Sequence, residues 1–365
     1  MSSSKLPNGA PSGTPAGSPA EPPVAPVLEP AESGPATAEL KHAARVLVTD
    51  VRPVAPGDRV LITADSAADQ QVAEATRAAA VAAGAEPTVL TYPTGTPVGP
   101  VPDEVAAAAV GAHHWINFSV GYHLYSDAYE AALANGCVYV ELTGMDVDMM
   151  VRTIGQVDNA LLDEVKTLLY RRSQAVDTLR LTNPAGCDIT MAIDPAGDPF
   201  WEDPPAEGGW PQMLGGQSGC MVVRESANGT LVFDGAAWPP DSLGLLSEPI
   251  VMTIVDGYAT TFSGGPEAKM YEQWLRSSGN AEALMFDHFC YGFNPGVTRP
   301  SGRILEDERI FGCVQIGIGA TELGSPVHSD GVVLSPSVWL DDQQIQADGA
   351  YVDPEIAALT DRLIA

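Results

Sequence analysis

The feature that most constrains the fold is a change in the pattern of apolar residues near the middle of the chain. From about residue 40 to 176, apolar strand-like runs alternate with alanine-rich helical stretches, and after about residue 177 β-rich segments are broken by Gly and Pro. Alternating strands and helices predict a parallel sheet covered by helices, whereas runs of short strands predict antiparallel or mixed sheet. We therefore expect an α/β N-terminal domain over 40–176 and an α+β C-terminal domain, with mostly antiparallel strands, over 177–365.

The individual elements follow from the same pattern. In the first half we expect strands at 59–64, 87–92, 115–119 and 137–142, and helices at 69–83, 127–134 and 159–173. In the second half we expect strands at 188–193, 230–234, 249–262, 312–319 and 330–340, and helices at 266–278 and 354–364. No G-x-G-x-x-G opens any of the helices, so a dinucleotide site is not expected.

The first 38 residues are mainly Pro, Ala, Ser and Gly, and this composition predicts a disordered tail because it cannot bury enough apolar surface to offset the entropy of ordering.

The net charge of −29, from 18 basic and 47 acidic residues, argues against binding to nucleic acid. The five cysteines are scattered and contain no C-x-x-C pair, which fits a reducing cytoplasm. No apolar run is long enough to span a bilayer and no signal pattern opens the chain, so we expect a cytoplasmic protein without membrane contact.

The second half also carries a candidate metal site. His328 and Asp330 are two apart, so in a strand both side chains would point to the same face, and His288 would have to arrive from a different strand. Two imidazoles and one carboxylate are the ligand set of a mononuclear non-haem Fe(II) site with open positions. The alternative is that the histidine and the aspartate only form a hydrogen bond with each other in a loop. Separately, the acidic run Glu306-Asp307-Glu308 predicts a solvent-exposed turn.

Several short motifs together resemble a known superfamily. They are Trp210-Pro211-Gln212, Gly229-Thr230-Leu231-Val232-Phe233-Asp234, Gly264-Gly265-Pro266-Glu267-Ala268, His288-Phe289-Cys290-Tyr291-Gly292-Phe293-Asn294-Pro295, His328-Ser329-Asp330 and Trp339-Leu340-Asp341-Asp342. This succession resembles the M29 metallopeptidase-like superfamily, and within it most of all the 2,5-dihydroxypyridine 5,6-dioxygenases. The resemblance implies an aminopeptidase T/dihydroxypyridine dioxygenase-like fold over nearly all of the chain after the tail, with specific motifs in the second half.

The residues at the metal positions separate the two chemistries of that superfamily. Its aminopeptidases hold two metal ions, and one ligand is a glutamate six residues before the Asn of Gly-x-Asn-Pro, where this chain has His288. A histidine ligand of the aminopeptidases appears here as Gln315, and an upstream glutamate appears as Gln217 or a neighbour. Amides are poor substitutes for these ligands at a two-metal site. The resemblance therefore implies one Fe(II) per chain, held by His288, His328 and Asp330.

The resemblance also implies residues around the metal. The segment 118–123 resembles the one that carries the dioxygenase's acid-base histidine, which gives His123 a catalytic role; the alternative is a structural histidine at the start of a helix. Gln212 stands where the dioxygenase has a histidine, so it could orient a hydroxyl or ring nitrogen but could not act as acid or base. Gln315 and Tyr291 are further candidates for substrate binding, and a buried amide bonded to backbone is the alternative for Gln315.

The sequence thus predicts a mononuclear Fe(II)-dependent dioxygenase that cleaves a hydroxylated aromatic or heteroaromatic ring, such as a dihydroxypyridine, with O2. The alternatives are an M29-type metallo-aminopeptidase, another non-haem iron oxygenase of a biosynthetic pathway, and a metal-free descendant that only binds a ligand. Because relatives in the superfamily form dimers or larger rings, the resemblance also implies a homo-oligomer.

Overall fold

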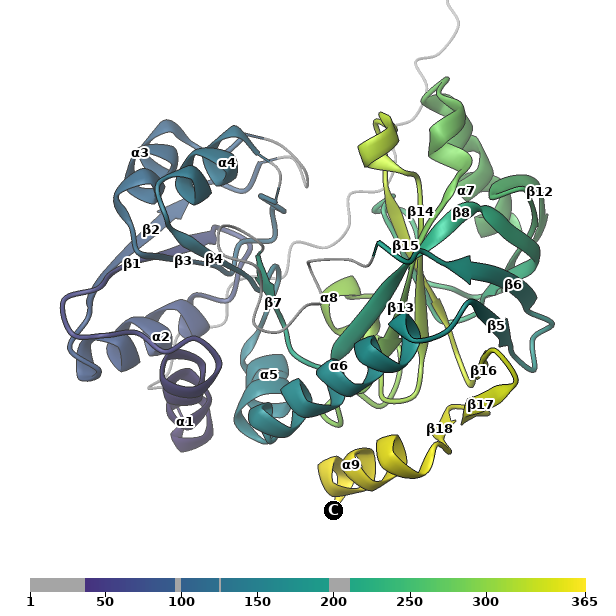
Figure 1. Cartoon of the computed structure of the whole chain (residues 1–365). Coiled ribbons are helices and arrows are strands. Elements are labelled where there is room, and N and C mark those ends of the chain that lie inside the picture. The colour runs from purple at the N-terminus through teal and green to yellow at the C-terminus, as the bar shows by residue number, and fades with distance from the viewer. Residues whose placement is uncertain (1–36, 96–99, 125, 197–210) are drawn as a thin grey trace, which may run out of the picture. The chain divides into compact units, whose positions relative to one another are not determined.

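The computed structural model describes residues 37–95, 100–124, 126–196 and 211–365, whose strands form two sheets (Figure 1). The first sheet has the strand order β2-β1-β3-β4-β7 and every pair in it is parallel. The second has the order β10-β9-β15-β14-β13-β8-β6-β5-β16-β17-β18, with the β11–β12 hairpin joined through β8, and its pairs are antiparallel. The predicted fold class, an α/β half followed by a mostly antiparallel α+β half, is confirmed.

The first sheet is built from the alternation seen in the sequence. Its strands are β1 (Arg59–Asp65), β2 (Glu86–Tyr92), β3 (His114–Asn117), β4 (Val138–Glu141) and β7 (Gln212–Met213). The helices of this half are α1 (Ala38–Val46), α2 (Gln70–Ala82), α3 (Asp103–Gly111), α4 (Asp127–Ala134), α5 (Val147–Met150) and α6 (Asn159–Gln174). Side chains of α1, α2 and α5 form one core with Val60 and Ile62 of β1, whereas α3 and α4 form another core with Leu61. Helices therefore cover both faces of the sheet, as Figure 1 shows.

A cluster of buried polar groups lies at the carboxyl ends of these parallel strands. Glu141, at the end of β4, is fully buried and accepts hydrogen bonds from Asn117, Tyr139 and Thr143. Burial raises the pKa of Glu141 from 4.5 to about 7, although these hydrogen bonds lower it in part. The folded protein therefore holds a proton on Glu141 at a pH where the unfolded chain has released it.

This raised pKa makes stability depend on pH. The stabilising contribution of protonated Glu141 is fully present below its unfolded pKa and is lost as pH rises through about 7, so the loss between pH 5 and 8 reaches about 3 kcal/mol. Glu141→Gln has nearly the same shape and cannot ionise. We expect urea unfolding to show that Glu141→Gln gains stability relative to wild type as the pH rises from 5 to 8, whereas Glu104→Gln, at an exposed position, shows no such gain. Parallel pH profiles for wild type and Glu141→Gln would contradict the assignment.

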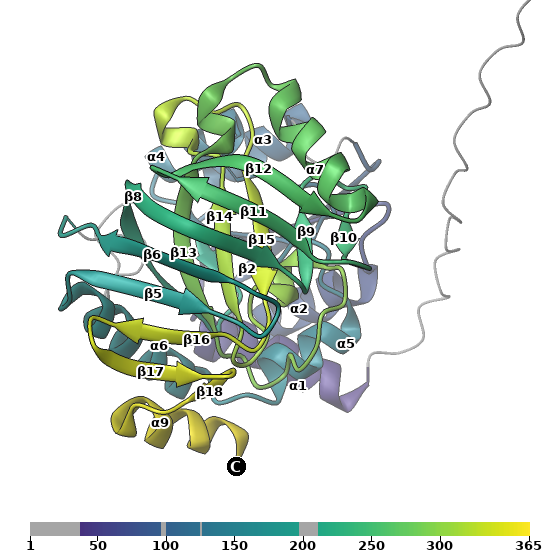
Figure 2. The same cartoon turned by 90° about the vertical axis from the view of Figure 1, so that its right-hand side faces the viewer.

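The second sheet contains the remaining strands. They are β5 (Thr178–Thr182), β6 (Asp188–Ile193), β8 (Gln217–Phe233), β9 (Ala236–Trp238), β10 (Gly244–Leu245), β11 (Ile250–Val255), β12 (Tyr258–Gly264), β13 (Phe286–Gly292), β14 (Val314–Ile318), β15 (Ser329–Val333), β16 (Ser337–Leu340), β17 (Gln343–Ala347) and β18 (Ala350–Tyr351). The helices here are α7 (Pro266–Ser277), α8 (Ile304–Asp307) and α9 (Pro354–Ile364). Figure 2 shows β16, β17, β18 and α9 following one another at one edge of the sheet.

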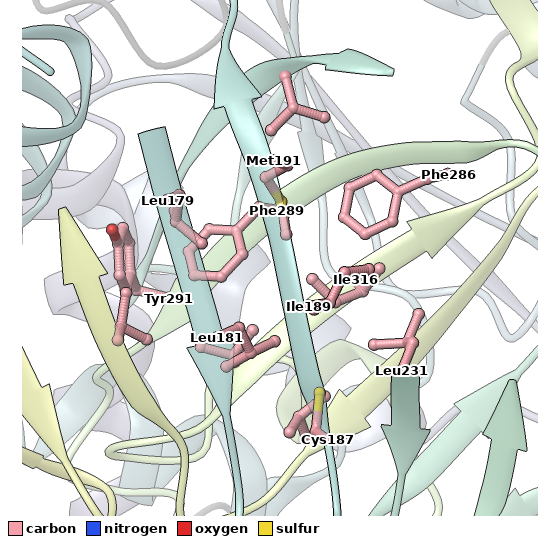
Figure 3. Close-up of a cluster of buried hydrophobic side chains, with 14 of the residues drawn as sticks. Leu179, Leu181, Cys187, Ile189, Met191, Leu231, Phe286, Phe289, Tyr291 and Ile316 are labelled. Atoms are coloured by element: carbon pink, nitrogen blue, oxygen red, sulfur yellow. The ribbon is translucent and has the colours of Figure 1, made fainter. Parts of the chain in front are cut away.

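The core of this half is formed by alternate side chains of the central strands. Leu179, Ile189, Phe289, Tyr291 and Ile316 are buried in it, from β5, β6, β13 and β14 (Figure 3). Because side chains alternate across a strand, residues of β13 and β14 that lie between these positions face the other way. That opposite face of β13 and β14 carries the candidate site described below.

Several predictions are refined or corrected by the fold. The segment 249–262 is a hairpin and not one strand, because Asp256 and Gly257 both have positive φ (48° and 82°) and turn the chain between β11 and β12. Helices α1, α3, α5 and α8 are additional to the predicted elements. Residues 1–36 of the predicted tail lie outside the described ranges, and the last residue of the predicted tail, Ala38, is the first residue of α1. The domain boundary at residue 176 stays a prediction.

The prediction of a solvated acidic turn at 306–308 is wrong. Glu306 and Asp307 are buried, and the side chain of Glu308 is 12% exposed. Glu306 pairs with Arg152 at 2.8 Å and with Arg303 at 2.6 Å. Charges become buried when they are paired, and the distant partner Arg152 cannot be foreseen from the local sequence.

Two further findings concern the described residues as a whole. All five cysteines are free and buried, in agreement with the absence of a predicted disulfide framework. No helix in the described ranges combines the length and the apolar character that crossing a membrane requires.

Candidate metal centre

Three adjacent strands of the second sheet bring the predicted ligands together. β14 lies between β13, which carries His288, and β15, which carries Asp330. Gly317 of β14 pairs with Asp330, and His328 lies immediately before β15. His288 and Asp330 can therefore approach each other across the β14 backbone at Gly317.

A β-bulge in β13 sets the direction of His288. Phe286 pairs with Ile318 and Phe289 pairs with Ile316, so Asp287 and His288 together lie opposite one residue of β14, Gly317. An extra residue of this kind interrupts the strict alternation of side chains and redirects those beside it. Here it places the carboxylate of Asp287 3.1 Å from Nδ1 of His288, although consecutive residues of a regular strand face opposite ways.

One carboxylate oxygen of Asp330 lies close to both imidazoles. Oδ1 of Asp330 lies 3.2 Å from Nε2 of His328 and 3.5 Å from Nε2 of His288. The two rings are stacked with their centroids 5.2 Å apart. His328 and Asp330 share one face, as the two-residue period of a strand predicts, and His288 arrives from a second strand.

Gly317 leaves the space that the two rings need. A Cβ at this position would lie 2.5 Å from Cε1 of His288 and 2.8 Å from Cε1 of His328. Real Cβ atoms do not approach other atoms so closely, so any side chain here would displace both rings. A glycine on the middle strand is therefore part of the site.

Groups behind the rings fix which nitrogen is available to a metal. Nδ1 of His328 donates to the carbonyl of Gly319 at 2.9 Å, and Asp287 lies at 3.1 Å from Nδ1 of His288. Asp287 itself pairs with Arg224 at 2.9 Å. Partners of this kind on one imidazole nitrogen orient the other nitrogen toward a metal ion, so Nε2 of each ring is the available ligand atom.

Asp287 was not predicted as a site residue, and it offers an alternative ligand set. Ligand atoms of Asp287, His288 and His328 lie within 4.8 Å of one another. In that set both rings would use Nδ1, which in His328 already bonds the Gly319 carbonyl, and Asp287 would leave Arg224. We favour the set with Asp330 because both Nε2 atoms face its carboxylate. In the sequence, Asp287 is marked only by its position next to His288. The bulge that turns its carboxylate toward that ring is not visible in the sequence.

The charges of the site complement each other. Burial would lower the pKa of His288, but Cys290, Asp287 and Asp330 raise that pKa well above its ordinary value. Burial would likewise lower the pKa of His328, and Asp330 raises it. Burial would raise the pKa of Asp330, but the two imidazoles lower it. The two imidazoles and the carboxylate thus stabilise one another's charged forms, and a divalent cation bound beside them would interact with the same groups.

Two amides extend the site away from the rings. Nε2 of Gln315 donates to Oδ1 of Asp330 and lies 3.1 Å from Nε2 of His288. Nε2 of Gln217 donates to Oε1 of Gln315 at 3.2 Å and to Oε2 of Glu308 at 3.4 Å. Gln315 is thus in contact with the proposed ligands, and its amide is bonded to side chains and not to backbone.

His123 lies in a different setting, at the end of the parallel sheet. Its Nε2 is 2.5 Å from the hydroxyl of Tyr92, which is also 2.7 Å from the hydroxyl of Ser119. Nδ1 of His123 is buried and forms no hydrogen bond of good geometry among the described residues, although the Tyr122 backbone lies close enough to offset slightly the lowering of the ring's pKa by burial. In one arrangement Ser119 donates to Tyr92 and Tyr92 donates to Nε2 of His123, so the Nδ1–H of His123 is the one donor left unpaired. In the reverse arrangement Nε2–H donates to Tyr92 and Tyr92 donates to Ser119. Both Nδ1 and the hydroxyl hydrogen of Ser119 are then unpaired. The former arrangement is favoured, since unpaired buried groups are costly.

The loop that holds His123 contacts the second sheet. The ring of Tyr122 lies edge-on to that of Trp238, with centroids 6.2 Å apart, and Trp238 pairs with Asp330 across the β15–β9 ladder. Burial lowers the pKa of His123, and Asp65 partly offsets this, so the ring is neutral at pH 7. The contact links the His123 loop to the strand next to Asp330.

The structure does not bring the other two predicted substrate residues to this cluster. Gln212 lies in β7 and donates to the carbonyl of Val51 at 2.7 Å. Tyr291 is buried in the core, where it packs against Phe289 and its hydroxyl is 3.0 Å from that of Ser173. Strand alternation places Tyr291 on the face opposite His288. Trp210 of the Trp-Pro-Gln motif lies outside the described residues.

Comparison with known proteins places this arrangement in a family. The family model for 2,5-dihydroxypyridine 5,6-dioxygenase matches residues 48–353. The structure is similar to that of 2,5-dihydroxypyridine dioxygenase from Pseudomonas putida KT2440, with a TM-score of 0.68 and 18% identity over 88% of this chain and 100% of that chain. It is also similar to wild-type AmpT from Thermus thermophilus, with a TM-score of 0.59 and 14% identity over 86% of this chain and 99% of that chain. No curated protein sequence matches. The chain belongs to the 2,5-dihydroxypyridine 5,6-dioxygenase family.

Proposed function

We propose that this protein is a mononuclear Fe(II)-dependent dioxygenase that cleaves a hydroxylated aromatic or heteroaromatic ring, such as that of a dihydroxypyridine, with O2. The observation that carries the proposal is that Oδ1 of Asp330 lies within 3.5 Å of Nε2 of both His288 and His328, whose rings lie beside Gly317. Two imidazoles and a carboxylate on one face are the donor set of non-haem Fe(II) oxygenases. The family match and the fold shared with a 2,5-dihydroxypyridine dioxygenase support the same conclusion.

The residues of the chain have separate roles in this proposal. His288, His328 and Asp330 would hold one Fe(II), which when bound supplies open coordination positions and one-electron chemistry with O2. Asp287 and the Gly319 carbonyl hold the two rings in orientation. His123 would donate a hydrogen bond at Nδ1 to an oxygen of the substrate, and transfer of that proton would be balanced by the Tyr92 hydroxyl giving its proton to Nε2.

The test is oxygen consumption by the reconstituted protein. Protein loaded with Fe(II) without air should consume O2 when hydroxypyridines or catechols are added, and labelled O2 should place both oxygen atoms in a ring-opened product. The same protein loaded with Zn(II) or Co(II) should not release amino acids from small peptides. Peptide hydrolysis with two metals per chain, or the absence of O2 uptake with all tested rings, would overturn the proposal.

A further inference from the structure

We propose that Gln217 and Glu308 are positioning residues that fix the amide orientation of Gln315, and thereby the hydrogen bond that Gln315 gives to the metal-binding carboxylate of Asp330. The inference rests on the proposed function, because it concerns the affinity of the same site. It assigns a role to the buried acidic segment and to two amides that do not contact substrate in the proposal.

The register of the strands puts these side chains on one face of the sheet. Gln217 pairs with Gly292 and Gln315 pairs with Cys290, so both follow alternate positions of β13. His288 is two residues before Cys290 and therefore lies on the same face, and Gly317, opposite Asp330, is two residues after Gln315. The amides of Gln217 and Gln315 can then form a continuous row that ends at the proposed ligands.

The guanidinium of Arg309 is the first group of this hydrogen-bonded row, and its position is fixed by the backbone. Arg309 is fully buried, and its Nε and Nη1 atoms donate to the carbonyls of Leu214 and Leu305 at 2.7 and 2.6 Å. Nη1 also donates to Oε2 of Glu308 at 2.9 Å. Bonds to backbone hold the guanidinium in place, and the guanidinium in turn holds the Glu308 carboxylate.

In each of the next hydrogen bonds of the row, the donor and the acceptor are determined by the bond before it. When Glu308 is ionised, as it is at pH 8, its oxygens only accept, so the atom of Gln217 that faces Glu308 must be the nitrogen. The same nitrogen contacts Gln315, so the atom of Gln315 that it meets must be the oxygen. The nitrogen of Gln315 is then the atom left to face Asp330, where it donates to Oδ1.

This orientation matters because an amide has two chemically different ends. Without Gln217, nothing in the row prevents Gln315 from turning its oxygen toward Asp330, where it would repel the carboxylate and leave Oδ1 without its donor. Loss of a hydrogen bond that orients a metal ligand reduces metal affinity by about 10–100-fold. Gln217 and Glu308 should therefore control metal binding without contacting the metal.

The experiment is a Co(II) titration of the full chain without air, followed by the visible absorption of the bound ion, so that no catalytic turnover is needed. It is carried out at pH 8, above the pKa of about 7 to which burial raises Glu308. Gln217→Met, which keeps the side-chain length and removes the donor, and Gln315→Leu should each weaken binding at least about 10-fold. The double variant should bind no more weakly than Gln315→Leu, because Gln217 acts through Gln315. Gln344→Leu, on β17, is the control and should bind as wild type does.

Further variants guard against a simple folding defect. Glu308→Gln should retain affinity, since its amide oxygen can accept from both Arg309 and Gln217, whereas Glu308→Leu should lose it. Wild-type affinity in Gln217→Met, or additive losses in the double variant, would overturn the inference while leaving the proposed function intact. If wild type binds no Co(II), or His288→Ala binds it as tightly as wild type does, the proposed site is wrong and the inference falls with it.

Discussion

Replacing His288 by alanine is expected to abolish Fe(II) binding and O2 consumption. The change removes one of three proposed ligands and leaves Asp287 and Asp330 without the imidazole between them. We expect the metal affinity to fall by more than about 100-fold, beyond the effect of losing an outer hydrogen bond. Asp330→Asn should have a similar effect with almost no change in shape, because an amide oxygen is a much weaker ligand than a carboxylate.

Metal content after anaerobic reconstitution and an oxygen electrode measure these effects. His42→Ala is the matched control, since His42 is exposed on α1 and its ring lies 3.2 Å from Arg45 within the same helix. This variant should retain wild-type iron content and O2 uptake. Full iron loading and turnover by His288→Ala would reject the ligand set, and loading in Asp330→Asn but not in Asp287→Asn would favour the alternative set that contains Asp287.

The architecture could be predicted from the sequence because it follows from local periodicity. The alternation around β1, α2 and β2 is complete within one stretch of chain, and each core face is visible as an apolar period. The turn at 256–257 is not evident from the apolar period, because the Asp-Gly pair lies within a long apolar stretch that continues on both sides. Element type was thus more predictable than the points where the chain turns.

The candidate site could be predicted in part for the same reason. The pairing of His328 with Asp330 follows from the two-residue period of a strand, and the structure places their atoms 3.2 Å apart. Asp287 could not be found in this way, because its role depends on a bulge opposite Gly317. Tyr291 was expected near the site, yet the same period that serves His328 and Asp330 places it in the core on the other face.

The burial of the acidic segment depends on residues far away in the chain. Glu306 pairs with Arg152, which is 154 residues earlier, as well as with the nearby Arg303, and Glu308 accepts from Gln217, which is 91 residues earlier, as well as from the adjacent Arg309. A run of acidic residues alone is typical of a solvated turn, and its burial becomes reasonable once these partners are known. Long-range pairing of charges and amides is the part of this site that local sequence patterns do not contain.

Introducing one methyl group at Gly317 is expected to disable the metal site while leaving the fold intact. In Gly317→Ala the new Cβ would lie 2.5 Å and 2.6 Å from Cε1 and Nδ1 of His288, and 2.8 Å from Cε1 of His328. These atoms belong to side chains that can turn away, so the cost in stability should be about 1–3 kcal/mol. The turned rings would no longer direct their Nε2 atoms at Asp330, so the metal affinity should fall by about 100-fold or more, as for the loss of a ligand.

Anaerobic metal titration and urea unfolding measure the two effects separately. Gly111→Ala is the control, because no atom lies within 4 Å of a Cβ at that position. Wild-type metal affinity in Gly317→Ala would show that the ion does not bind between the two rings and Asp330.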